Sequence, residues 1–122
     1  MSKQTKFVIT GTTPLAGEIQ VLGAKNEALK ALALSLLMQA PFTIRHVPDI
    51  EDVARMIEIL RAIGVTLTAG VKGDYSIDST RVTSAHLPDE LVSRLRASVV
   101  LIGPLLARWG DVSFAHPGGC AI

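Results

Sequence analysis

Lys25 and Asn26, two side chains able to bind an anion, are adjacent where a predicted strand meets a predicted helix. Gly23 permits a sharp turn there, and the apolar run up to Met38 predicts a helix that begins at about Asn26. The first N–H groups of a helix and the positive end of its dipole favour a negative charge. This stretch is therefore suited to a phosphate or carboxylate ligand. The alternative is that Asn26 only caps the helix and Lys25 is a solvated charge.

Cys120 is the single cysteine of the chain, and it follows Gly118 and Gly119 in a predicted loop. A lone cysteine is commonly a small buried hydrophobic residue. A loop with two glycines instead favours exposure and movement, which a reactive thiol requires. His116, four residues upstream, is placed to tune the thiol. On this stretch alone, a structural and a reactive cysteine both remain open.

Arg94 and Arg96 lie on the same predicted helix but differ in their neighbours. Arg94 has Glu90 one turn before it, so an ion pair at this spacing predicts a structural role. Arg96 has no acidic partner at helical spacing and lies at the edge of an apolar stripe. Its guanidinium matches the oxygens of a ligand phosphate. The alternative is a partner elsewhere in the fold, or a side chain that extends to water.

Three helices are predicted to position these residues. The first spans about residues 26–38 and the second residues 48–64. The third spans about residues 88–103, and Pro104 predicts a kink or break before a last helical turn, because proline cannot continue the hydrogen-bond ladder. The apolar stripe of the second helix consists of Ile50, Val53, Ile57, Leu60 and Ile63.

Short strands are predicted between the helices from alternating apolar and polar residues. They are residues 7–10, 18–22, 42–45, 65–68, 75–78 and 112–115. The fourth and fifth form a hairpin with Gly73-Asp74 as its turn. The order from Glu18 to Asp78 is then β-α-β-α-β-β, and a strand with a glycine turn recurs at residues 111–122 without a following helix. We therefore expect an α/β fold with one complete unit and the start of a second, from a longer chain.

Composition and charge exclude several classes of protein. The 122 residues suffice for one domain with a core, and 48% hydrophobic against 4% aromatic residues predicts that this core is aliphatic. The net charge of +1, without a basic run, argues against nucleic acid as the main partner. The longest apolar stretch, residues 31–38, is too short to span a bilayer, so we expect no membrane partner.

The numbers and spacing of cysteine and histidine residues indicate the cell compartment and whether a metal is bound. One cysteine cannot form an internal disulfide framework, and it fits a reducing cytoplasm. No signal peptide is recognisable at the N-terminus. The three histidines (His46, His86 and His116) lack the spacing of metal ligands. We expect a cytoplasmic protein with neither a metal nor another cofactor.

Four segments together resemble the bacterial UDP-N-acetylglucosamine enolpyruvyl transferases, also called 1-carboxyvinyltransferases. They are residues 15–26 with Gly-Ala-Lys-Asn, residues 47–64, residues 95–108 with Leu-Arg-Ala-Ser and Gly-Pro-Leu-Leu-Ala-Arg, and residues 117–120 with Pro-Gly-Gly-Cys. The resemblance covers nearly the whole chain. The related enolpyruvylshikimate-phosphate synthases share the fold but typically have serine after the lysine and lack this cysteine loop. Asn26 and Cys120 therefore favour the first group.

The resemblance implies a fold of the inside-out α/β barrel type, built from β-α-β-α-β-β units in two domains. Residues 1–22 would form a strand pair that joins the other domain, and residues 23–122 would be a partial domain that stops after the cysteine loop. The missing C-terminal remainder of the same chain would supply the general base and further arginines.

The resemblance also implies an activity: transfer of the enolpyruvyl group of phosphoenolpyruvate to the 3′-hydroxyl of UDP-N-acetylglucosamine, for peptidoglycan synthesis. Phosphate would leave by addition and elimination through a tetrahedral ketal. Lys25 would bind phosphoenolpyruvate, Asn26 would hold the substrates, Arg96 would contact the nucleotide sugar, and Cys120 would donate a proton to the enol carbon. Without the remainder of the chain, residues 1–122 are expected to be inactive.

Three other functions remain open at this point. One is a non-catalytic phosphate- or nucleotide-binding α/β module that uses the helix start at Lys25. A second is the sibling enolpyruvyl transferase of the shikimate pathway. A third is a purely structural β-α-β unit.

Overall fold

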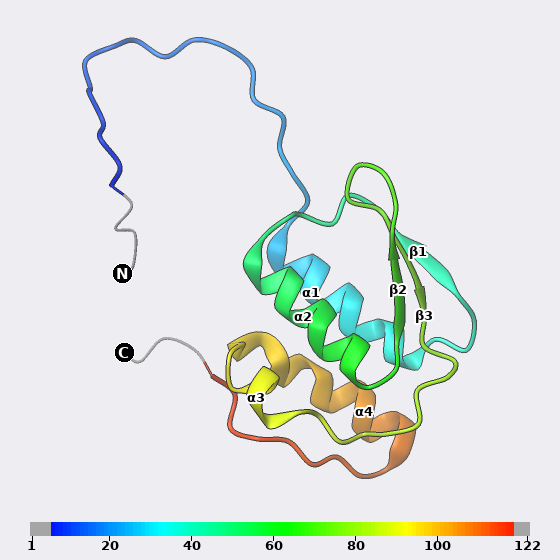
Figure 1. The fold of residues 1–122 in the computed structure, drawn as a ribbon. Helices are drawn as coiled ribbons and strands as arrows, with labels where there is room; N and C mark the ends of the chain where they lie inside the picture. Colours follow the sequence, from blue (N-terminus) through cyan, green and yellow to red (C-terminus); the bar gives the residue numbers. More distant parts are fainter. Residues whose placement is uncertain (1–5, 119–122) are drawn as a thin grey trace.

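Helices pack beside a three-stranded antiparallel sheet, as the computed structural model shows for residues 6–118 (Figure 1). The α-helices are α1 (Lys25–Leu34), α2 (Glu51–Ala62), α3 (Asp89–Val92) and α4 (Ile102–Trp109). Two 3₁₀ helices are η1 (Ser35–Leu37) and η2 (Arg96–Leu101). The strands are β1 (Phe42–Ile44), β2 (Thr66–Ala69) and β3 (Tyr75–Asp78). This mixture of helices and sheet confirms the predicted α/β class, while the barrel and the repeated unit remain predictions.

The sheet has the order β1-β3-β2, and both neighbouring pairs are antiparallel. Ile77 in the central strand is opposite Phe42 on one side and Leu67 on the other. The predicted β2–β3 hairpin is confirmed. Its turn is centred on Lys72 and Gly73, with φ of 54° and 79°, rather than on Gly73-Asp74. Lys72 and Gly73 thus adopt the left-handed conformation that short hairpins with a right-handed twist require.

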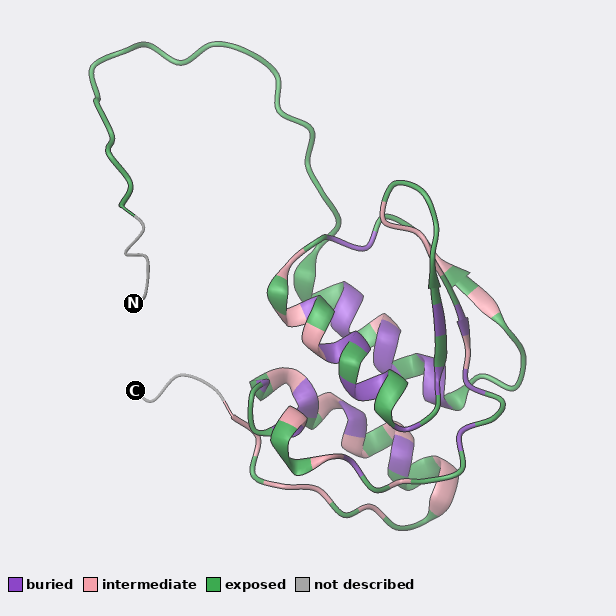
Figure 2. Ribbon diagram, viewed as in Figure 1, coloured by how far each residue is buried: buried purple, intermediate pink, exposed green. Residues whose placement is uncertain are grey.

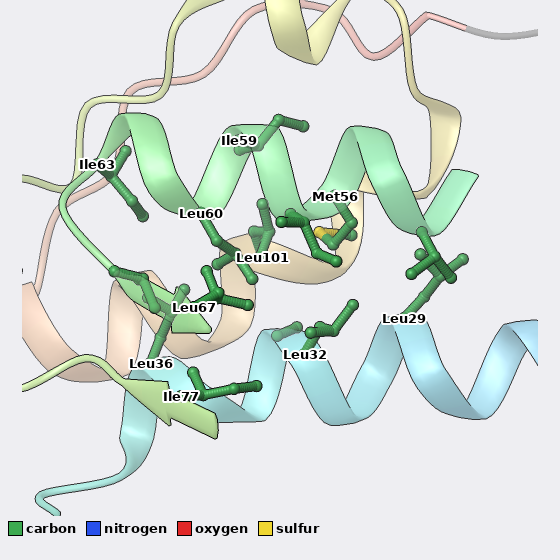
Figure 3. Close-up of a cluster of buried hydrophobic side chains, with 14 of the residues drawn as sticks. Leu29, Leu32, Leu36, Met56, Ile59, Leu60, Ile63, Leu67, Ile77 and Leu101 are labelled. Atoms are coloured by element: carbon green, nitrogen blue, oxygen red, sulfur yellow. The ribbon is translucent and has the colours of Figure 1, made fainter. Parts of the chain in front are cut away.

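The core is aliphatic, as the composition predicted, and it lies between the helices and one face of the sheet (Figures 2 and 3). Leu32 of α1, Leu60 of α2 and Ile77 of β3 are fully buried, and Leu101 of η2 joins them. The predicted stripe of α2 faces this core, although Ile50 at its start is only half-buried. Packing of α1 on α2 therefore orients the start of both helices.

The third helix is not continuous, so this prediction was wrong. It divides into α3, the extended residue Leu95 (φ −139°, ψ 109°), η2 and α4. Buried side chains follow at every third position, at Val92, Leu95, Ser98 and Leu101. A repeat of three matches the three residues per turn of a 3₁₀ helix and not the 3.6 of an α-helix.

Pro104 does not break the chain where the break was predicted. It is the third residue of α4, within the first turn of that helix. Backbone N–H groups in the first turn of a helix have no partner inside the helix, so proline loses nothing there. The break lies nine residues earlier, at Leu95, whose burial turns the chain inward.

The segment before α1 forms none of its predicted strands. Residues 6–23 follow an extended path away from the rest of the molecule, with Ile19 91% and Val21 88% exposed (Figures 1 and 2). A strand needs a partner for its N–H and C=O groups, and nothing in residues 6–118 pairs with this segment. The predictions of strands at residues 7–10 and 18–22 are thus wrong for this chain, while pairing with another domain stays a prediction.

The last predicted strand, residues 112–115, is also incomplete. Only Ser113 takes part in a ladder, as an isolated parallel bridge to His86. Among residues 6–118, no helix is long and apolar enough to cross a bilayer.

Candidate active site

Lys25 and Asn26 are the first two residues of α1, as the predicted helix start required. The residue that precedes the helix is Ala24, and no side chain caps the helix. Asn26 lies inside the first turn and is exposed, so the interpretation that it merely caps α1 is wrong. Its amide and the Lys25 ammonium are both accessible next to free backbone N–H groups. The arrangement suits an anionic ligand.

Lys25 has a partner that the sequence did not reveal. Its Nζ donates a hydrogen bond to Oδ2 of Asp52 at 2.9 Å, and the two side chains are 51% and 39% exposed. Asp52 lies in the first turn of α2, so the ion pair joins the starts of α1 and α2. At this exposure an ion pair contributes only about 0–1 kcal/mol to stability. Its main consequence is to orient the ammonium.

Gly23 is required by a close contact and not by its backbone angles. A Cβ at this position would lie 2.1 Å from the carbonyl oxygen of His46. His46 itself has the left-handed φ of 56°, and its N–H donates to Oδ1 of Asp74 at 3.2 Å. The loop before α2 thus supports the chain just before Lys25. Only glycine permits that approach.

Arg96 is exposed at the first position of η2, and Arg94 is exposed in the turn before it. Within residues 6–118 the ion pairs are Lys25–Asp52 and Arg55–Glu51, so the predicted pair of Arg94 with Glu90 does not form. The reason is that α3 ends at Val92, which removes the i,i+4 geometry at Arg94. An Arg94–Glu90 ion pair therefore cannot be the reason for a difference in role between Arg94 and Arg96.

Cys120 and Gly119 lie outside the described residues, so the structure leaves the role of Cys120 as a prediction. The chain leading to them is described as far as Gly118, whose N–H donates to the carbonyl oxygen of Val92 at 3.3 Å. This bond places the segment against the turn that precedes Arg96. The imidazole Nδ1 of His116 lies 3.2 Å from the carbonyl oxygen of Pro117.

The described candidate residues, Lys25, Asn26 and Arg96, come from elements at one end of the molecule. The starts of α1 and α2 and the 3₁₀ helix η2 lie toward the side away from the sheet (Figure 1). α1 packs against η2, which brings the elements that carry Lys25 and Arg96 into contact. The fold therefore gathers the described candidates on adjoining elements. No group of three metal-ligating side chains occurs in the part of the chain that the structure describes.

Neither of two cavities in the structure contains Lys25, Asn26 or Arg96. The larger, of about 550 Å³, lies at residues 36–39, Thr80 and Arg108, and the smaller, of about 250 Å³, lies between the start of α2 and the hairpin turn. Near the larger one, hydrogen bonds from the hydroxyl and backbone N–H of Thr80 lower the pKa of Asp78. The described candidate residues therefore line neither of these two cavities.

Comparison with known proteins places the chain in a family. The family model described as EPSP synthase (3-phosphoshikimate 1-carboxyvinyltransferase) matches residues 9–122. The chain belongs to the EPSP synthase family. A solved structure of similar fold is that of the enolpyruvyl transferase NikO from Streptomyces tendae, with a TM-score of 0.70 and 31% identity over 79% of this chain and 22% of that one.

Two relatives within the family carry the same name. The chain is 42% identical over 119 residues to the UDP-N-acetylglucosamine 1-carboxyvinyltransferase of Cellvibrio japonicus (strain Ueda107). It is 39% identical over 117 residues to the enzyme of that name from Coxiella burnetii (strain Dugway 5J108-111). Each match covers 96% of this chain, but the chain spans only 28% and 27% of those relatives.

Proposed function

We propose that this chain is the N-terminal part of an enzyme that transfers the enolpyruvyl group of phosphoenolpyruvate to UDP-N-acetylglucosamine. The identity of 42% and 39% to two enzymes named for that reaction, across 96% of the chain, carries the proposal. The exposed Lys25-Asn26 pair at the start of α1 supports it, because the site needs a cation next to free N–H groups for an anionic substrate. The proposed place of the enzyme is peptidoglycan synthesis in the cytoplasm.

In the proposed reaction, the 3′-hydroxyl of the sugar gives its proton to the general base of the C-terminal remainder as its oxygen forms a bond to C2 of phosphoenolpyruvate, while C3 receives a proton from the Cys120 thiol. The resulting ketal then loses phosphate from C2, and C3 returns a proton to the Cys120 thiolate, which restores the double bond. Lys25 would hold the phosphoenolpyruvate anion, with its ammonium oriented by Asp52. Asn26 would hold the substrates beside it, and Arg96 would contact the nucleotide sugar.

The proposed domain organisation follows the same family. Residues 1–22 would pair as strands with the other domain, and residues 23–122 would complete an inside-out barrel domain together with the C-terminal remainder. The exposure of Ile19 and Val21 supports this arrangement, because apolar side chains of a lone extended segment gain from burial on a partner.

The second candidate is 3-phosphoshikimate 1-carboxyvinyltransferase, since the family model carries that description. The residue after Lys25 favours the first candidate, because it is asparagine and not the serine typical of the shikimate enzymes. The two reactions share phosphoenolpyruvate and differ in the hydroxyl substrate.

Phosphate release by the full-length protein tests the proposal. With phosphoenolpyruvate present, we expect release with UDP-N-acetylglucosamine and none above background with shikimate 3-phosphate. The opposite preference would establish the sibling activity. Binding of both substrates without release would establish a non-catalytic module.

A further inference from the structure

The tip of the β2–β3 hairpin is bound to the loop of residues 46–48, which leads from β1 toward α2. Two hydrogen bonds join these segments just beyond the end of the β1–β3 ladder. The N–H of Val47 donates to the carbonyl oxygen of Gly73 at 2.9 Å, and the N–H of His46 donates to Oδ1 of Asp74 at 3.2 Å. A Cβ at Gly73 would lie 2.5 Å from the carbonyl oxygen of Val47, so the two backbones are in direct contact.

The same loop lies against the chain that leads into α1. A Cβ at Gly23 would lie 2.1 Å from the carbonyl oxygen of His46 and 3.4 Å from Cδ of Pro48. Lys25 follows Gly23 by two residues, and its partner Asp52 lies in the first turn of the helix that the loop enters. One loop therefore borders both the backbone just before Lys25 and the helix that carries Asp52.

His46 has a backbone conformation that depends on its surroundings. Its φ of 56° is in the left-handed region, which residues other than glycine rarely adopt unless neighbouring groups fix them. The Asp74 carboxylate accepts from its N–H on one side, and Gly23 packs on its carbonyl oxygen on the other. A cavity of about 250 Å³, lined by Val47 and Asp74 among others, leaves room for the loop to shift once the bond to Asp74 is lost.

We propose that Asp74 is a positioning residue that acts through the loop of residues 46–48 on Lys25. The proposal rests on the proposed function, and it adds that the hairpin tip helps to shape the phosphoenolpyruvate site. The path runs from the Asp74 carboxylate to the N–H of His46, and from the His46 carbonyl oxygen to Gly23 beside the start of α1. Loss of the first hydrogen bond releases the loop and, with it, the direction of the Lys25 ammonium.

Kinetics of phosphate release by the full-length enzyme test this role. Asp74→Ala removes the acceptor for the His46 N–H, so kcat/KM for phosphoenolpyruvate should fall about 3- to 10-fold, the range that one net hydrogen bond spans. Asp74→Asn keeps an oxygen acceptor there and should stay within about twofold of the wild type. The Kd of UDP-N-acetylglucosamine should change less than about twofold in both variants, because Arg96 belongs to η2, outside this path.

Asp78→Ala is the matched control. Asp78 is at the other end of β3, and its carboxylate also accepts from a backbone N–H, that of Thr80 at 2.9 Å. This variant should keep kcat/KM for phosphoenolpyruvate within about twofold of the wild type.

A double mutant separates positioning from a general loss of stability. In a Lys25→Ala background, Asp74→Ala should lower kcat/KM for phosphoenolpyruvate no further, because Asp74 acts through Lys25. The full loss in that background, an equal loss in Asp78→Ala, or an Asp74→Asn variant as impaired as Asp74→Ala would overturn the proposal. Wild-type kinetics in Asp74→Ala would overturn it too.

Amide hydrogen exchange of the full-length protein tests the path without catalysis. In Asp74→Ala, exchange should become at least about threefold faster at residues 46–47 and in the first turn of α1, where the N–H of Ala28 donates to the carbonyl oxygen of Ala24 at 3.0 Å. Asp78→Ala should change neither region. Unchanged exchange in the first turn of α1 would overturn the path. If the wild-type enzyme releases no phosphate, the proposed function fails and the kinetic role of Asp74 fails with it, while exchange still decides whether the path exists.

Discussion

The ion pair between Lys25 and Asp52 orients the Lys25 ammonium and leaves it exposed to solvent. Both side chains remain partly accessible, and the pair joins the first turns of two helices. An incoming anion then meets an ammonium that is already directed to the helix start. The same carboxylate also adds a negative charge beside Lys25, so the proposed substrate phosphoenolpyruvate would have to compete with it for the ammonium.

Replacement of Lys25 by alanine is expected to weaken anion binding. Loss of a charged hydrogen bond costs about 1.5–3 kcal/mol, which corresponds to a fall in kcat/KM for phosphoenolpyruvate of about 10- to 150-fold. The measurement is steady-state phosphate release by the full-length enzyme. Lys72→Ala, in the exposed hairpin turn, is the control and should stay within about twofold of the wild type. A similar fall in kcat/KM in both variants would show that Lys25 does not bind phosphoenolpyruvate.

Arg96 and Arg94 provide a second matched pair. Arg96→Ala is expected to weaken binding of UDP-N-acetylglucosamine by about 1.5–3 kcal/mol, if its guanidinium contacts the nucleotide. Arg94→Ala is expected to change neither binding nor stability by more than about 0.5 kcal/mol, because its predicted ion pair is absent. Titration calorimetry on the full-length enzyme measures the binding by both variants, and urea unfolding measures their stability. A larger loss from Arg94→Ala would exchange the roles of the two residues.

At the scale of elements, the stretch from α3 through η2 is organised by a repeat of three. Val92, Leu95 and Leu101 are directed into the core, while Val99, which an α-helical stripe would bury, is 47% exposed. This arrangement leaves Arg96 at the surface at the first position of η2. The 3₁₀ geometry therefore decides which side chains of this stretch lie at the surface.

Two core substitutions test the repeat. Leu95→Ala should lower the free energy of unfolding by about 2–5 kcal/mol, because it leaves a cavity at a residue that is 3% exposed. Val99→Ala should lower it by less than about 1 kcal/mol in residues 1–122. Urea unfolding followed by circular dichroism compares them. A greater loss from Val99→Ala would mean that the stretch is a regular α-helix after all.

Arg108, near the end of α4, forms hydrogen bonds to two earlier parts of the chain. Its Nη1 donates to the carbonyl oxygen of Leu36 at 2.9 Å and its Nη2 to that of Ser79 at 3.0 Å. The guanidinium carbon lies 4.5 Å from the centre of the Trp109 ring. These contacts hold the end of α4, from which the chain turns back toward Gly118.

At the scale of the whole molecule, the segment before α1 is apolar but does not pack against the domain. Leu15 is 97% and Phe7 91% exposed, and neither packs on the rest of the chain. The fold of residues 25–118 has its own core without this segment. We therefore expect residues 25–118 to stay folded when the segment before α1 is removed.

The isolated chain of residues 1–122 is expected to self-associate and to release no phosphate from the two substrates. Exposed apolar side chains drive association, and an open site cannot exclude water while a ketal forms. Deletion of residues 1–22 should reduce the association, measured by light scattering, without lowering the melting temperature. Phosphate release above a Cys120→Ser blank would show that these residues suffice for the chemistry.

The local elements and the family were determined by the sequence alone, because each depends on neighbours along the chain. Apolar spacing predicted α2, the hairpin of β2 and β3, and a first helix from about Asn26, which in the structure begins at Lys25. The segments with Gly-Ala-Lys-Asn and Pro-Gly-Gly-Cys indicated the enolpyruvyl transferases, and the comparisons confirmed the family. Strand predictions before α1 failed because a strand needs a partner that periodicity alone does not provide.

Only the tertiary structure decided the contacts between segments far apart in the sequence. Lys25 meets Asp52 across 27 residues, and the glycines at positions 23 and 118 lie against the carbonyl groups of His46 and Ser93. The same holds for the 3₁₀ geometry that sets the surface position of Arg96. These features depend on packing, because a long-range contact forms only when the core brings two backbones together, and no spacing along the chain specifies that distance.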